Sequence, residues 1–214
     1  MTTVEHRENL PVRTRVGVPT ITLISMVLAP ALFLASTIAF LTLGDGINDG
    51  LIGGVINAWT MIVLVMAFAG CARAVESVMP KSAQFILFGG AAAGVGGAGF
   101  GMTAIYQQVL QDDHGVDGAT TLDAHPFSIL ALLPWGWFMP VTCMAVGLCL
   151  WRGQLAPWWH GVLFILGGLL FVTGRPTQMG FIAVTTDLVL LVAFWLLASR
   201  LRGGTLGHDP LGQP

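Results

Sequence analysis

Long apolar runs alternate with short polar stretches along this chain. Six such runs cover residues 17–43, 51–72, 83–110, 127–151, 157–174 and 178–199. A helix needs about 20 apolar residues to cross the ~30 Å hydrocarbon core of a bilayer. Because the runs are continuous and do not alternate with polar positions, they predict helices and not strands. We therefore expect an all-α bundle of six transmembrane helices.

The composition agrees with this pattern. Hydrophobic residues make up 55% of the 214 positions and charged residues only 9%, with a formal net charge of −2. Soluble domains carry roughly 25% charged residues. These figures exclude a soluble enzyme and a nucleic-acid binder and make the lipid bilayer the expected partner. We expect one transmembrane domain, 17–199, between a polar N-terminal tail, 1–16, and a polar C-terminal tail, 200–214.

The basic residues predict the orientation of the bundle. If every run crosses the membrane, all but one of the nine basic residues fall on the side of the N-terminus, and these are Arg7, Arg13, Arg15, Arg73, Lys81, Arg152, Arg200 and Arg202. The side with excess arginine and lysine is the cytoplasmic one. We therefore expect both termini in the cytoplasm and the protein in the inner cell membrane. Only Arg175 falls on the outer side.

A glycine-rich segment, Gly89–Gly101, forms the middle of the third run. Gly89, Ala93, Gly97 and Gly101 repeat every four residues, so one face of the predicted helix has almost no side chains. Small residues let helix backbones approach closely in lipid. This pattern favours the tightly packed centre of the bundle. Room for an elongated ligand and a helix-mediated oligomer through this face are the alternatives.

Asp187 lies about nine residues into the last run, ~13 Å from its outer end. An aspartate at that depth costs a few kcal/mol. No lysine or arginine lies at a similar depth in another run, so we expect no ion pair. Without a counter-charge the carboxyl is expected to be a neutral acid that donates or takes up a proton, or to make a plain inter-helix hydrogen bond. The candidate hydrogen-bond partners are Asn57, Thr103, Thr142, Thr185 and Thr186.

Polar residues also gather on the predicted outer side, namely Asp45, Asp49, Asp113, His114, His125 and Arg175. Carboxylates and imidazoles can bind divalent metals, but the spacing here matches no metal motif. We therefore expect a solvated acidic surface, no metal and no cofactor. Arg175 is expected either to pair with one of these aspartates or to bind an anionic head group.

Three functional hypotheses remain open, and they differ in whether the chain is an enzyme. The first is a non-catalytic accessory, sensor or immunity-type membrane protein. The second is a small membrane enzyme on a lipid or isoprenoid substrate, in which Asp187 is the catalytic acid, as in terpene cyclisation. The third is a proton-coupled carrier that uses Asp187 and a helix broken near Pro134 and Pro140. The expected cavity-lining residues are Asn57, Trp59, Trp135, Trp137 and Trp195.

Several short segments resemble a group of uncharacterised six-span bacterial membrane proteins of the kind common in actinobacteria. They are Gly44-Asp45-Gly46, the turn from Arg73 to Pro80, Gly147-Leu148, Trp151-Arg152-Gly153, Pro157 and Gly161-Val162-Leu163. The resemblance implies a six-helix bundle with a short basic turn and a proline between the fourth and fifth spans. It implies no activity, and no functional residue follows from it.

Overall fold

The computed structural model describes residues 17–115 and 126–206, and its regular elements there are all helices. They are α1 (Thr20–Leu43), α2 (Leu51–Glu76), α3 (Pro80–His114), α5 (Pro126–Arg152), α6 (Trp158–Gly174) and α7 (Gly180–Gly203). The six helices match the six apolar runs, so the predicted all-α bundle is confirmed. Five of them are long and apolar enough to cross a membrane, and α6 is shorter, with 17 residues.

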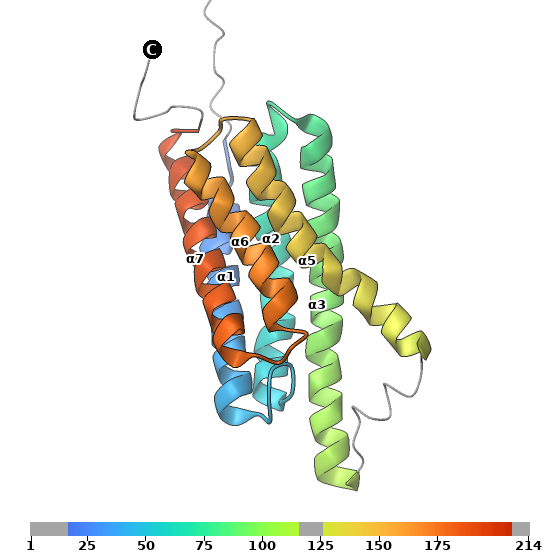
Figure 1. Ribbon diagram of the computed structural model, residues 1–214. Helices are drawn as coiled ribbons and strands as arrows, with labels where there is room; N and C mark the ends of the chain where they lie inside the picture. Colours follow the sequence, from blue (N-terminus) through green and yellow to red (C-terminus); the bar gives the residue numbers. More distant parts are fainter. Residues whose placement is uncertain (1–16, 116–125, 207–214) are drawn as a thin grey trace, which may run out of the picture.

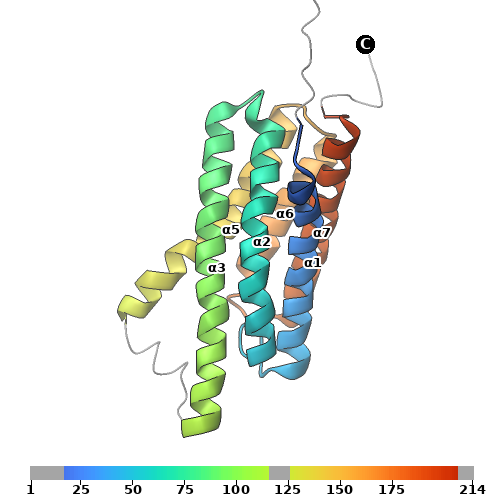
Figure 2. The same ribbon diagram turned by 180° about the vertical axis from the view of Figure 1, so that it is seen from behind.

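The helices form a closed ring. Each helix packs against the next one along the chain, and α7 returns to pack against α1. Figure 1 shows α5, α6 and α7 in front of α1, α2 and α3, and Figure 2 shows the same two layers from behind. The core between the layers contains Phe68 of α2, Phe164 of α6 and Phe194 of α7, whose rings meet edge to face. Large apolar side chains also cover the outer surface of the ring, which is consistent with a lipid environment.

The glycine-rich segment of α3 packs inside the bundle. A Cβ atom on Gly101 would lie 2.8 Å from the carbonyl oxygen of Gly54, and one on Gly54 would lie 2.7 Å from that of Gly101. Side-chain atoms of Phe68 and Thr142 occupy the equivalent space at Gly90 and Gly89. At these positions α3 approaches α2 and α5 closely, and among the described residues it contacts only these two helices, so it is a member of the ring and not its centre. The oligomer through the same segment stays a prediction.

Helix α3 is longer than its apolar run and continues through Asp112, Asp113 and His114. The sequence placed these three residues in a loop. The helix ends only at Gly115, which adopts the left-handed conformation (φ 63°) that terminates many helices and whose N–H bonds back to Gln111. As a result α3 extends beyond its neighbours at the end of the bundle opposite the last turn of α7 (Figure 1).

Helix α5 leans away from the ring over its first half, which Figure 1 shows in yellow. Pro134 and Pro140 lie inside this helix. Each proline removes a backbone donor and displaces the preceding turn, which is the usual cause of a bent helix. Within the described residues α3 and α6 make no contact with each other, so α5 is the element that separates them.

Candidate functional site

A buried ion pair joins Arg175, directly after α6, to Asp187 of α7. Nη2 of Arg175 lies 3.5 Å from Oδ2 of Asp187, and the two side chains are 7% and 0% exposed. The expectation that Asp187 has no ion-pair partner is therefore wrong, since Arg175 supplies a counter-charge. Asp187 lies seven residues into α7, about 10 Å along the helix axis. The long arginine side chain reaches that depth from the turn, whereas the sequence argument compared only backbone positions.

Two further polar residues complete a cluster with this pair. Thr37 of α1 accepts a 2.7 Å hydrogen bond from Nη2 of Arg175 and donates its own hydroxyl to Oδ2 of Asp187. Asn48, in the loop after α1, accepts a 3.0 Å hydrogen bond from Nη1 of Arg175. We call Thr37, Asn48, Arg175 and Asp187 the polar cluster. It ties α1, α7 and the loops that follow α1 and α6 to one another.

The local backbone explains how the two loops bring their side chains together. The loop after α1 turns tightly through Gly46 and Gly50, both at positive φ, and Asn48 itself is left-handed (φ 68°). Asparagine tolerates this conformation better than most residues. At the other loop, a Cβ on Gly174 would lie 3.0 Å from the backbone nitrogen of Ala183, so the α6–α7 turn closes tightly there. This close approach holds Arg175 over the start of α7.

Two aromatic rings flank the guanidinium group. Its central carbon lies 4.1 Å from the ring centre of Phe33 and 5.5 Å from that of Phe171, and the two rings are stacked. Such cation–π contacts stabilise a desolvated cation. Burial lowers the pKa of Arg175, whereas the charge and the hydrogen bond of Asp187 raise it. Arginine starts from so high a pKa that it stays protonated in this setting.

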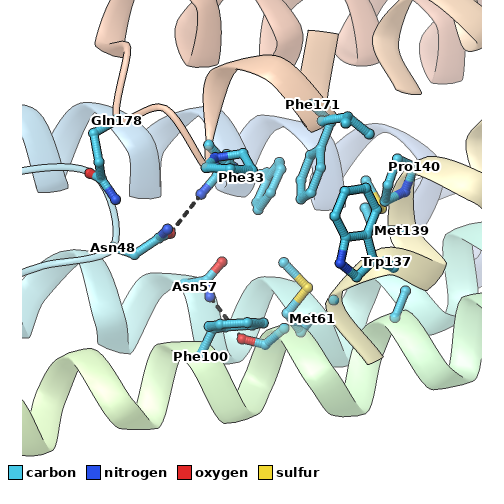
Figure 3. Close-up of a pocket in the computed structure, with 16 residues that line it drawn as sticks. Phe33, Asn48, Asn57, Met61, Phe100, Trp137, Met139, Pro140, Phe171 and Gln178 are labelled. Atoms are coloured by element: carbon cyan, nitrogen blue, oxygen red, sulfur yellow. Dashed lines mark hydrogen bonds between the residues drawn. The ribbon is translucent and has the colours of Figure 1, made fainter. Parts of the chain in front are cut away.

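A cavity of about 460 Å³ lies beside the polar cluster (Figure 3). Its polar side chains are Asn48, Asn57, Arg175 and Gln178. Its apolar lining consists mainly of Phe33, Met61, Phe100, Trp137, Met139, Pro140, Phe171 and Val172. Asp187 is not one of the described residues that line it. The cavity is therefore mostly apolar, with one arginine and three amides.

Asn57 is the most deeply buried polar residue of the cavity wall, with 3% of its surface exposed. Its Nδ2 donates a 2.9 Å hydrogen bond to the backbone carbonyl of Gly97 in α3. Its Oδ1 is buried and has no hydrogen-bond partner among the described residues. In Figure 3 that oxygen points toward the interior of the cavity. Asn57 thus lines the cavity, and its amide bonds to α3. The partners of Asp187 are Thr37 and Arg175, and the expected partners do not bond to it: Asn57, Thr103, Thr185 and Thr186 donate to backbone carbonyls, and the Thr142 hydroxyl has no partner among the described residues.

The four predicted tryptophans lie in different places. Trp137 lines the cavity and is also 44% exposed. Trp59, Trp195 and Trp135 do not line it and are 64%, 54% and 41% exposed on the outside of the bundle. The phenylalanines Phe33 and Phe171, which do line it, were not singled out from the sequence, because nothing distinguishes them there from other apolar residues of a span.

The predicted outer residues gather only in part. Arg175 contacts the loop that also carries Asp45 and Asp49, but through Asn48. Asp113 and His114 are exposed at the far end of α3, and His125 lies outside the described residues. Within residues 17–115 and 126–206, no group of three or more histidines, cysteines or acidic residues is arranged to hold a metal ion.

Comparisons of the chain with protein-family models, curated proteins and solved structures find no match. No functional residue is therefore taken from a relative. The helices and their apolar surfaces place the chain in a broad class, the multi-pass helical membrane proteins. Any further assignment depends on the polar cluster and the cavity.

Proposed function

We propose that this chain is a non-catalytic integral membrane protein of the accessory or sensor type. The main support for the proposal is the set of contacts made by Asp187, the carboxylate that lies deep in a span. Asp187 is 0% exposed, takes a hydrogen bond from Thr37 and pairs with Arg175. A catalytic acid or a proton carrier needs access to its substrate or to water. The contacts of Asp187 instead support a role in joining helices.

A second candidate is a membrane enzyme with a lipid or isoprenoid substrate, and one observation favours it. The cavity has aromatic walls, formed by Phe33, Phe100, Trp137 and Phe171, of the kind that stabilise a carbocation. Its weakness is the acid, because Asp187 does not line the cavity. Thr37 and Arg175 both bond to Oδ2 of Asp187, and Oδ1 is buried without a partner among the described residues. No comparable observation favours the third hypothesis, the proton-coupled carrier.

Asp187→Asn separates these hypotheses. Lipids are extracted from four cell cultures and compared by mass spectrometry. The cultures express the unaltered chain, Asp187→Asn, Asp187→Glu and the exposed control Asp45→Asn. A non-catalytic protein leaves all four lipid profiles alike. A prenyl product that disappears with asparagine and persists with glutamate contradicts the proposal and supports the enzyme. Solute uptake into proteoliposomes that depends on pH and is lost in Asp187→Asn contradicts it in favour of the carrier.

We also propose that the protein lies in the inner cell membrane with both termini in the cytoplasm. Arg73, Lys81, Arg152 and Arg200 lie at or next to the ends of α2, α3, α5 and α7 on one side of the bundle. This distribution supports a cytoplasmic assignment for that side.

Cysteine labelling tests this orientation, because the three native cysteines are buried. A membrane-impermeant maleimide added to intact cells is expected to label Asp113→Cys and to label Lys81→Cys only after permeabilisation. The opposite result would reverse the topology.

A further inference from the structure

Two buried polar atoms of the residues that line the cavity lack hydrogen-bond partners in the part of the chain that the structure describes, and this indicates a ligand. Both Asn57 and Arg175 line the cavity. Oδ1 of Asn57 and Nε of Arg175 are buried without a hydrogen-bond partner among the described residues. Leaving such a group unsatisfied costs about 1–3 kcal/mol, and more for a charged one. One is an acceptor and the other a donor. A ligand that both donates and accepts hydrogen bonds would satisfy both.

The charge of the site narrows the ligand class. Arg175 already has a counter-charge in Asp187, so the pair is neutral as a whole. An anionic head group would face the Asn57 carbonyl oxygen and add a second negative charge beside Asp187. A cationic one would face Arg175. A hydroxyl has one donor and two acceptor positions and no charge, so it suits both atoms.

The rest of the cavity suits a hydrocarbon. Phe33, Phe171, Trp137 and Met139 provide apolar contact, and the volume of about 460 Å³ lies within the roughly 300–1,000 Å³ of small-molecule sites. The lining residues come from α1, α2, α3, α5 and α6 and from the loops after α1 and α6, so the cavity lies between the helices of the bundle.

We propose that this cavity binds an uncharged amphiphile, whose hydroxyl-type head group lies between Asn57 and Arg175 and whose hydrocarbon part lies among Phe33, Phe171 and Trp137. The inference goes beyond the proposed function, since binding of this kind would serve a sensor and an enzyme equally. For a sensor, the amphiphile is the molecule that is detected.

A photoreactive alcohol tests the proposal on the full chain in nanodiscs. The probe is a dodecanol analogue with a diazirine in its chain, and the labelled peptides are mapped by mass spectrometry. Three unlabelled competitors share a dodecyl chain and differ in head group. They are dodecanol, dodecyl phosphate and dodecyltrimethylammonium. We expect labelling of peptides with Met61, Met139 or Val172, and competition by dodecanol at least about fivefold stronger than by the charged competitors.

Variants test whether the competition by dodecanol depends on the proposed hydrogen bond between its hydroxyl group and Asn57. Asn57→Leu removes the acceptor and is expected to weaken dodecanol competition about fivefold, the effect of one hydrogen bond. Thr60→Val is the matched control: its hydroxyl is buried one turn along α2, bonds to its own helix at Ile56 and does not line the cavity. Should Asn57→Leu fail to fold, Val172→Trp places a larger side chain in the cavity and removes no polar group. This variant is expected to abolish the part of the labelling that dodecanol competes away.

Three results would overturn the inference. They are labelling that no competitor reduces, stronger competition by either charged amphiphile, and unchanged dodecanol competition in a folded Asn57→Leu or Val172→Trp. Conversion of an alcohol to a product would contradict the non-catalytic proposal and leave the binding inference intact, so the two fail separately.

Discussion

Replacing Asp187 by leucine leaves the guanidinium group of Arg175 buried without its counter-charge. At 3.5 Å and an effective dielectric constant of about 20, the attraction lost is about 5 kcal/mol. This agrees with the roughly 3–5 kcal/mol measured when one partner of a buried pair is removed. Water cannot replace the carboxylate easily, because Arg175 is only 7% exposed. We therefore expect Asp187→Leu to lower the free energy of unfolding by about 3–5 kcal/mol.

The double variant Asp187→Leu with Arg175→Met removes both charges. Replacing a buried pair by apolar residues is often neutral or stabilising, and methionine keeps contact with Phe33. We expect the double variant to regain most of the lost stability. Unfolding by SDS titration in mixed micelles, followed by tryptophan fluorescence, measures all variants.

Ser36→Ala is the control, since it removes a buried but uncharged hydrogen bond, to the carbonyl of Gly53, worth about 0.5–1.5 kcal/mol. A cost for Asp187→Leu no larger than that of Ser36→Ala, or no recovery in the double variant, would refute the ion-pair reasoning.

Two more predictions concern packing and lipid contact. Gly101→Leu is expected to lower the melting temperature by more than about 10 °C or to prevent folding, because its Cβ would lie 2.8 Å from the carbonyl oxygen of Gly54; Ala91→Leu, on the exposed face of α3, is expected to change it little. Thermal unfolding in detergent compares the two, and equal stability would contradict the close packing of α2 and α3. Lipids brominated in the acyl chain are expected to quench a variant with Trp59 as its single tryptophan more than one with Trp137 alone. Equal quenching would contradict their different placement.

The helices of this protein could be predicted because membrane spans have a simple physical requirement. Every backbone polar group must be satisfied within the span, so a long apolar run has few alternatives to a helix. The end of α3 was missed since Asp112, Asp113 and His114 are polar, and apolarity marks the membrane boundary but not the last helical turn. Gly115, a frequent helix terminator, was the available signal.

The polar cluster was only partly predictable. Both residues stood out in the sequence, Asp187 because it lies deep in a span and Arg175 because it is the basic residue on the predicted outer side. From the sequence alone they were nevertheless treated as separate features. Their separation by a tight turn and two turns of helix was the signal that an arginine side chain could join them. Thr37 and Asn48 had no such signal. Their roles depend on the return of α7 to α1, a contact between the first and the last helix that the structure describes.

The unequal helix lengths have a consequence for the surrounding lipid. Helix α6 has 17 residues and is about 26 Å long, whereas α3 has 35 residues and is about 52 Å long. The hydrocarbon core of a typical bilayer is ~30 Å thick, and mismatch is relieved by local thinning or thickening of the bilayer at a fraction of a kcal/mol per Å. Leu166 and Leu169 of α6 face outward, so lipids meet this short helix directly. The hydrocarbon core exceeds the length of α6 by about 4 Å, so we expect the bilayer to be locally thinner beside α6.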